Sequence, residues 1–291
     1  MIDLKGVKGA AEWPKTRAAI EAVVTGILGK LPKERIEPQV KVLDEQSFPG
    51  YVRKRISYFV DNWTRITAWL FEPESRMDVP GILCCHQTVA QGKDEPAGIS
   101  GDPILAFARH YAQLGYVTMA PDCITAGERV SIGLEPYDTA TFYEDYPKMS
   151  AMGKMLWDHS VALDVLADTS HVDKERLGVI GHSLGAYNAL FLAAFDERVE
   201  VCVASCGFTR FADDTNPQRW ARDEGFIHFP GLRKHIEAGS YPFDWEHVLA
   251  VTAPTPVLLL TALNDNIFPN TQSCRKAVKM AKRVYSFLGE K

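Results

Sequence analysis

After Pro80, short apolar runs alternate with segments that carry helical periodicity. The runs occupy 82–85, 116–119, 177–180, 199–204 and 257–260. Between them, 103–114 and 150–167 each place their apolar residues on one face of a helix. Runs that are apolar throughout are typical of strands buried on both faces. The pattern therefore predicts an α/β fold with a mostly parallel central sheet and helices on both faces.

The first 80 residues predict a different organisation. Residues 14–30 have helical periodicity, with Pro14 near the first turn, and indicate an N-terminal helix. We interpret 1–50 as a helical extension packed on the main domain. Segments 51–60 and 66–71 are rich in β-branched and aromatic residues and are joined by Asp61-Asn62. They predict an antiparallel hairpin at one edge of the sheet.

Residues 207–250 are too long for a simple connection, and they are rich in Trp, Phe, Pro and charge. We expect short helices that pass over the carboxyl edge of the sheet, as a lid-like insertion in a single domain spanning 1–291. Trp220 and His228 in this segment are candidate substrate or lid contacts. Packing in the core explains the aromatic residues of the segment equally well.

A Gly-x-Ser-x-Gly motif follows the run 177–180, and an Ala/Leu-rich helical segment follows the motif. This strand, turn and helix form the setting of a nucleophile elbow, in which glycines let strand and helix approach closely while the serine hydroxyl stays exposed. The sequence therefore predicts an α/β-hydrolase fold with Ser183 as nucleophile. The motif reads Gly181-His182-Ser183-Leu184-Gly185.

Backbone donors for an oxyanion hole are expected at two places. The Leu184 N–H lies at the start of the helix after the elbow, where it can donate to a developing oxyanion. The second donor is expected in the loop after 82–85, where Thr88 is the first choice and Gln87 the second. We interpret His86 as a brace for this loop.

The acid of a catalytic triad is expected after a late strand. Asp265 follows the apolar run 257–260, within Asn264-Asp265-Asn266, and we assign it as that acid. A plain turn is the alternative interpretation, because Asn and Asp both favour turns.

A base histidine is expected after the acid, but none of the eight histidines follows Asp265. We expect a helix over 271–281 and a strand over 284–288, and we expect the sequence to end before the histidine and a final helix. The alternative is that an upstream histidine substitutes, and His228 and His235 are the candidates. Without a base, serine is a poor nucleophile at neutral pH.

The sequence resembles the dienelactone hydrolase and acetyl xylan esterase-like branch of the α/β-hydrolases over about residues 80–280. The resemblance is carried by His86 with Gly92-Lys93-Asp94-Glu95, Gly115-Tyr116-Val117 with Ala120-Pro121-Asp122, Gly127-Glu128-Arg129, Trp157-Asp158, Val172-Asp173-Lys174-Glu175-Arg176, the 181–185 motif, and Asp265-Asn266-Ile267-Phe268-Pro269.

This resemblance implies hydrolysis of an ester or similar acyl bond through a serine acyl-enzyme, with no metal or organic cofactor. It also implies a histidine in a His-Gly-Phe-like context beyond residue 291, so the sequence departs from the pattern at a position that the mechanism needs. A dienelactone hydrolase proper would carry a cysteine nucleophile, whereas Ser183 points to esterase chemistry. An aminopeptidase or thioesterase, and a non-catalytic protein of the same fold, are the alternatives.

Glu128 and Arg129 lie in a turn after the run 116–119 and are expected near the same edge of the sheet as the elbow. They are candidate substrate contacts, although an ion pair that braces the lid is the simpler interpretation.

The charge, the N-terminal sequence and the cysteines bear on the binding partners, the location and the metal content that we expect. The net charge of −5 is spread without a basic block, so neither nucleic acid nor an anionic membrane is favoured. A small acyl ester is the expected substrate, and the oligomeric state stays open. The chain starts without a signal peptide pattern, so we expect a cytoplasmic protein. Cys202 and Cys206 lack a second Cys or His pair, which does not favour a zinc site.

Overall fold

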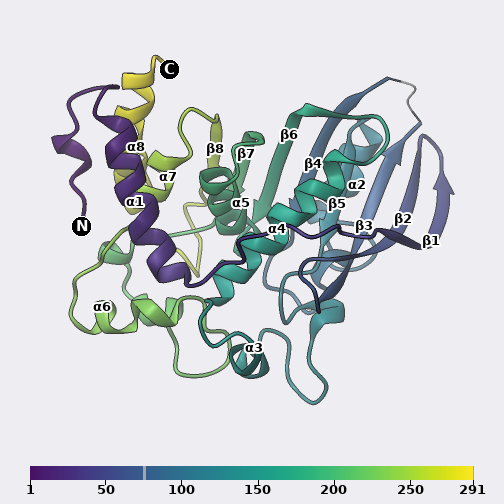
Figure 1. Cartoon of the computed structure of the whole chain (residues 1–291), viewed down its shortest axis with the longest axis horizontal. Helices are drawn as coiled ribbons and strands as arrows, with labels where there is room; N and C mark the ends of the chain where they lie inside the picture. The colour runs from purple at the N-terminus through teal and green to yellow at the C-terminus, as the bar shows by residue number, and fades with distance from the viewer. Residues whose placement is uncertain (75–76, 291) are drawn as a thin grey trace.

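The computed structural model describes residues 1–74 and 77–290, and one twisted sheet crosses the whole molecule (Figure 1). Within the described residues, the sheet has eight strands in the order β1-β2-β3-β5-β4-β6-β7-β8. The strands are β1 (Lys41–Phe48), β2 (Tyr51–Phe59), β3 (Arg65–Pro73), β4 (Val79–Cys85), β5 (Val117–Pro121), β6 (Val172–His182), β7 (Val199–Ser205) and β8 (Val257–Leu260).

The five apolar runs of the sequence become β4 to β8, and these strands pair in parallel with their neighbours. The hairpin of β2 and β3 is also present, and β3 joins the parallel part through antiparallel pairing with β5. The prediction of a mostly parallel sheet is confirmed.

The expected edge hairpin is not the edge of the sheet. Strand β1 pairs outside β2, within the segment expected to be a helical extension. Its residues are exposed from Lys41 to Ser47, including Val42 and Leu43. Because neither face of β1 is buried, the sequence carries no alternation of apolar and polar positions that would have predicted this strand.

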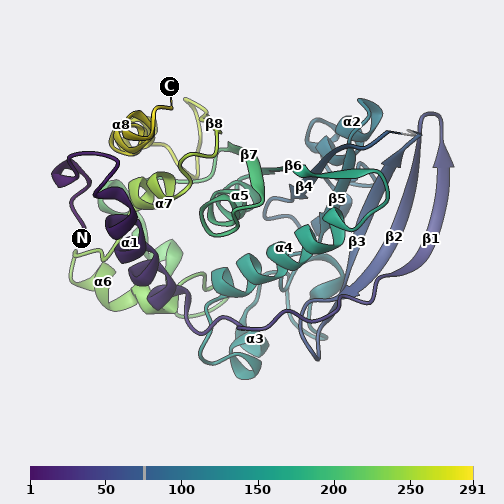
Figure 2. The ribbon, with the colours of Figure 1, turned by 45° about the horizontal axis from the view of Figure 1, so that its top comes forward.

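Helices cover both faces of the sheet (Figure 2). Helix α2 lies against one face, while α4 and α5 lie on the other, and α7 and α8 pack together near β8. The helices are α1 (Trp13–Leu28), α2 (Phe107–Gln113), α3 (Ala140–Asp145), α4 (Ala151–Ala167), α5 (Leu184–Phe195), α6 (Arg233–Glu237), α7 (Trp245–Val251) and α8 (Thr271–Leu288). No helix in the described ranges is long and apolar enough to cross a bilayer.

Helix α8 continues through the stretch expected to be a strand. Ala277, Ala281 and Val284 are buried at helical spacing, and Gly289 ends the helix in the left-handed conformation. The apolar residues of 284–288 therefore continue one face of an amphipathic helix, so the expected strand there is wrong.

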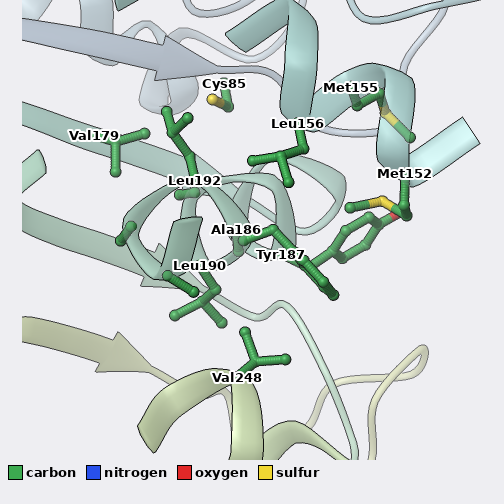
Figure 3. Packing of buried hydrophobic residues seen from close by; sticks show 14 of the residues in the cluster. Cys85, Met152, Met155, Leu156, Val179, Ala186, Tyr187, Leu190, Leu192 and Val248 are labelled. Atoms are coloured by element: carbon green, nitrogen blue, oxygen red, sulfur yellow. The ribbon is translucent and has the colours of Figure 1, made fainter. Parts of the chain in front are cut away.

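Helix α5 lies at the centre of the core, with every residue from Leu184 to Ala194 buried. Figure 3 shows its Ala186, Leu190 and Leu192 between the sheet and the neighbouring helices. A helix that is apolar on all sides is typical of a fully buried position. The residue that starts this helix is therefore held by packing on all sides.

Shortening Leu190 to Ala should lower the free energy of unfolding by about 2–5 kcal/mol, because the side chain is fully buried and its loss leaves a cavity. Leu258→Ala on β8 is the matched control. That leucine is 53% exposed, so its loss should cost less than about 1 kcal/mol. Urea unfolding of both variants measures the difference, and equal losses would contradict the central position of α5.

Candidate active site

Ser183 occupies the sharp turn between β6 and α5. Its backbone has a φ of 52° and a ψ of −113°, in a region that residues with a side chain rarely adopt. The Ser183 N–H donates to the Ser205 carbonyl of β7 at 2.8 Å, and the Ser183 carbonyl accepts from Ala186 N–H at 2.9 Å. These bonds tie the strained residue to the sheet on one side and to the helix on the other.

The two glycines of the motif allow this turn because other backbone atoms occupy the space of their missing side chains. A Cβ on Gly185 would overlap the carbonyl group of Cys85 at the end of β4 and lie 2.9 Å from the His86 carbonyl oxygen. A Cβ on Gly181 would overlap Gly185. The elbow therefore depends on close backbone contact between β4, β6 and the first turn of α5.

A cavity of about 640 Å³ opens beside Ser183. Gln87 and Thr88 line it from the loop after β4, while Trp220 and His228 line it from the 207–250 segment. The other lining residues are Glu135, Pro136, Tyr137, Asp138, Tyr187, Arg219, Arg222, Gly225, Phe226, Ile267 and Phe268. The structure thus gathers the elbow, the loop after β4 and the 207–250 segment around one space.

Two of the expected oxyanion donors, the Gln87 and Thr88 N–H groups, belong to residues that line this cavity, and the third, Leu184, follows Ser183 directly in the chain. The N–H groups of Leu184, Gln87 and Thr88 have no hydrogen-bond partner within the part of the chain that the structure describes. Leu184 is the first residue of α5, where the positive end of the helix dipole favours negative charge. Unpaired N–H groups beside a serine hydroxyl are what an oxyanion requires.

The loop that carries Gln87 and Thr88 is braced from beneath. The fully buried His86 ring contacts the Gln87 carbonyl through Nδ1 at 2.7 Å, and its Nε2 accepts from the Cys123 N–H at 3.0 Å. Burial lowers the pKa of His86, which suits a neutral ring with one donor and one acceptor. The Tyr137 hydroxyl donates to the Gln87 carbonyl at 3.0 Å. His86 therefore acts as the expected brace.

Asp265 lies in the loop beyond β8 and its carboxylate serves a local turn. Its Oδ1 accepts from the N–H groups of Ile267 at 2.7 Å and Phe268 at 2.8 Å. This turn lies at the cavity, because Ile267 and Phe268 line the space beside Ser183. Burial lowers the pKa of His182, and the charge of Asp265 opposes that effect. Asp265 therefore forms the turn that the alternative interpretation expected. Its second oxygen, Oδ2, has no hydrogen-bond partner among the described residues.

No histidine of the described chain is hydrogen-bonded to the Ser183 hydroxyl. His182 Nδ1 is bonded to the Ser205 hydroxyl at 3.0 Å, and His235 Nδ1 to the Ser240 carbonyl at 3.1 Å. His228 shares the cavity with Ser183, but its Nε2 is bonded to the Tyr187 hydroxyl at 2.7 Å. Of the two upstream candidates, only His228 lines the cavity.

Glu128 and Arg129 do not line the cavity at Ser183. Glu128 pairs with Lys93 at 2.8 Å and with Arg55 at 2.7 Å, while Arg129 pairs with Asp158 of α4 at 2.8 Å. Both residues follow the carboxyl end of β5, at the same edge of the parallel sheet as the elbow, as expected. Neither is paired with a residue of 207–250, so the expected brace to the lid is wrong. These residues form ion pairs with β2, α4 and the segment after β4.

Three further residues at the cavity were not anticipated. Tyr187 lies one helical turn after Ser183, so the spacing of four residues on α5 is a signal that predicts it. Tyr137 and Arg222 come from long connections without periodicity, and the sequence carries no comparable signal for them. The Arg222 side chain has no hydrogen bond or ion pair within the described ranges. No three His, Cys, Asp or Glu side chains there are grouped as a metal site requires.

Comparisons with known proteins agree with this geometry. The model of the dienelactone hydrolase family matches residues 66–287. The putative hydrolase YtaP of Bacillus subtilis is 28% identical over 275 residues, covering 90% of this chain and 86% of that protein. The family match at 66–287 includes the elbow, the loop after β4 and Asp265.

Solved structures share the fold. A putative acetyl xylan esterase from Bacteroides fragilis has a TM-score of 0.74 at 19% identity and covers 97% of this chain and 74% of its own. A glucuronoyl esterase from Solibacter usitatus has a TM-score of 0.74 at 19% identity, and the match covers 97% of this chain and 82% of that one. The chain therefore has the α/β-hydrolase fold that its sequence predicts.

Replacing Gly185 by Ala should lower the free energy of unfolding by about 3 kcal/mol or more, because the added methyl group overlaps the backbone at the end of β4. Gly26→Ala is the control. It lies exposed in α1 with nothing near the added atom, so the same change should raise stability by about 0.5–1 kcal/mol. A tolerated Gly185→Ala would contradict the tight elbow.

The His228 ring should stay neutral at pH values well below those at which a histidine ordinarily gains a proton. Burial lowers the pKa of His228 from 6.5 to about 3. As the pH falls below about 6.5, the unfolded chain binds a proton at this position that the folded chain does not, so stability declines toward about pH 3. In NMR spectra, assigned with His228→Gln, its ring signals should not move between about pH 8 and pH 5. A midpoint near 6.5 would contradict the buried position.

Proposed function

Because this chain belongs to the dienelactone hydrolase family, we propose that it is a serine esterase that hydrolyses small carboxylic esters through an acyl-enzyme. The observation that carries the proposal is the placement of Ser183. Its strained backbone lies at an open cavity, beside the unpaired N–H groups of Leu184 and Thr88. This combination is the nucleophile elbow that acyl transfer uses.

In the proposed reaction, Ser183 Oγ attacks the ester carbonyl and forms a tetrahedral intermediate. The Leu184 and Thr88 N–H groups donate to its oxyanion, with Gln87 as the alternative donor. The carbon–oxygen bond to the alcohol then breaks, and the alcohol leaves with the serine proton. Water attacks the acyl-serine in the second half of the reaction and releases the acid.

Asp265 is proposed as the acid of the triad. No described residue is placed to act as the general base. The 207–250 segment is proposed to act as a lid-like insertion that shapes the cavity through Trp220 and His228. Since no described histidine contacts Ser183, acylation by an unactivated ester should be slow. An oxyanion hole and substrate binding alone still leave a residual rate above that in water.

The size and the lining of the cavity favour a substrate with a small acyl group. Its aromatic wall includes Trp220, Phe226 and Phe268, and its volume of about 640 Å³ is within the range of small-molecule sites. The solved structures of the same fold include a putative acetyl xylan esterase and a glucuronoyl esterase. We propose a carboxylic ester of comparable size as the substrate.

A fluorophosphonate probe should label the protein at Ser183, and p-nitrophenyl acetate should be hydrolysed. The activated ester is chosen because its leaving group needs little help from a general acid. Ser183→Ala should abolish labelling and lower the catalysed rate at least about a hundredfold. Ser205→Ala, which removes the neighbouring hydroxyl bonded to His182, should retain labelling.

Two results would contradict the proposal. Labelling that persists in Ser183→Ala would place the reactive group elsewhere. A folded wild-type protein with neither labelling nor hydrolysis would favour a non-catalytic member of the fold.

A further inference from the structure

A second cavity of about 720 Å³ lies on the other side of the loop that follows β5. Its walls come from the β2–β3 turn, this loop, α3 and the start of α4. The lining residues are Trp63, Thr64, Arg65, Ile124, Thr125, Glu128, Arg129, Ser131, Thr141, Phe142, Asp145, Tyr146 and Lys154. None of them lines the cavity at Ser183.

Trp63 is the most unusual residue of the second cavity, because its side chain is 89% exposed. The ring makes no aromatic or cation–π contact with the described residues. Its backbone is nevertheless fixed, since Asp61 Oδ1 accepts from the N–H groups of Trp63 at 3.0 Å and Thr64 at 2.7 Å. The turn therefore holds a large ring at the second cavity, and Trp is enriched at binding interfaces because its ring combines apolar surface with a polar N–H.

The turn is anchored by a charged network beneath it. Asp61 Oδ2 accepts from the Tyr146 hydroxyl at 2.9 Å and pairs with buried Lys154 at 3.2 Å. Lys154 also pairs with Asp158, which in turn pairs with Arg129 at 2.8 Å. The partners of Asp61 hold its pKa at about 2 against the opposing effect of burial. Lys154 and Arg129 are therefore already paired within the wall.

Of the other charges of the wall, one is held in ion pairs and one is held by hydrogen bonds to neutral groups. Glu128 lies between Lys93 and Arg55, at 2.8 Å and 2.7 Å. Arg65 donates to the Ser57 carbonyl at 2.9 Å and to its hydroxyl at 2.9 Å. Asp145 has no partner within the described ranges. An anion would have to compete with the hydrogen-bond partners of Arg65, and it would also face Asp145.

Hydroxyl groups supply the remaining polarity. Ser131 and Thr141 hydroxyls are bonded to each other at 2.8 Å, and each retains capacity for a further hydrogen bond. Thr125 is 6% exposed, and its hydroxyl has no partner within the described chain. A buried hydroxyl without a partner is uncommon and indicates a group that a ligand or water completes.

We propose that the second cavity binds a neutral sugar ring, with the C–H face of the ring stacked on Trp63. The ring hydroxyls then meet Ser131, Thr141 and Asp145. A sugar ring suits this site because it combines an apolar face with many neutral hydrogen-bonding groups. The wall supplies the same combination.

The second cavity is joined to the first by their shared loop. The Thr125 carbonyl accepts from the Tyr137 N–H at 2.7 Å, and Tyr137 lines the cavity at Ser183. If the proposed esterase function holds, a saccharide bound at Trp63 would belong to an esterified carbohydrate whose acyl group reaches Ser183. This link rests on the proposed function, whereas sugar binding itself does not.

Calorimetric titration with xylohexaose, cellohexaose and maltohexaose tests the site. It uses Ser183→Ala, so that no turnover occurs and a failure of ester hydrolysis leaves the binding result intact. At least one of these neutral oligosaccharides should bind. Adding Trp63→Ala should weaken that binding at least about tenfold, and Trp63→Phe should restore part of it.

Leu114→Ala is the matched control, because it also removes an exposed apolar side chain, 71% exposed, away from the cavity. It should leave binding unchanged, and Trp63→Ala should leave p-nitrophenyl acetate hydrolysis unchanged in the wild-type background. The proposal is overturned if none of the three sugars binds or if Trp63→Ala binds equally well. It is also overturned if hexagalacturonate, which is anionic, binds more tightly than all three.

Discussion

The backbone contact between the first turn of α5 and the end of β4 is the constraint on which the site depends. Gly185 has no room for a side chain because the Cys85 carbonyl group fills that space. The contact brings the free Leu184 N–H next to the loop that carries Gln87 and Thr88, and it leaves Ser183 at the outside of the turn with a φ of 52°. Strain of this kind persists only where surrounding structure holds it. Here the fully buried helix α5 and the Ser183 N–H bond to β7 supply the restraint.

Some parts of the site are held by this contact, and others are not. Ser183 and the Leu184 N–H are placed by β6 and α5, whereas Asp265 and most of the cavity wall come from loops after β4, β5, β7 and β8. His228 shares the cavity, but burial and its bond to Tyr187 keep its ring neutral and engaged. The described chain therefore has unpaired backbone N–H groups at the elbow and in the loop after β4, but no histidine hydrogen-bonded to the Ser183 hydroxyl. For such a site, activated esters are the informative substrates.

Much of the fold could be predicted from the sequence, because buried parallel strands and the 181–185 motif carry strong local patterns. The five apolar runs became β4 to β8, and the glycines predicted the elbow. Strand β1 was not predicted, because both its faces are exposed. The end of α8 was predicted as a strand, because a short apolar run is compatible with a strand or with one side of a helix. Ion pairs such as Glu128 with Lys93 join residues far apart in sequence, so no local pattern could place them.

The most direct test of the central claim is to trap the acyl-enzyme. The protein is mixed with p-nitrophenyl acetate, quenched in acid during turnover, digested, and mapped by mass spectrometry. If Ser183 is the nucleophile, the acetyl group is found on the peptide that contains Ser183, and it disappears in Ser183→Ala. Hydrolysis that proceeds with the acetyl group on another residue, or on none, would contradict the assignment of Ser183 as the nucleophile.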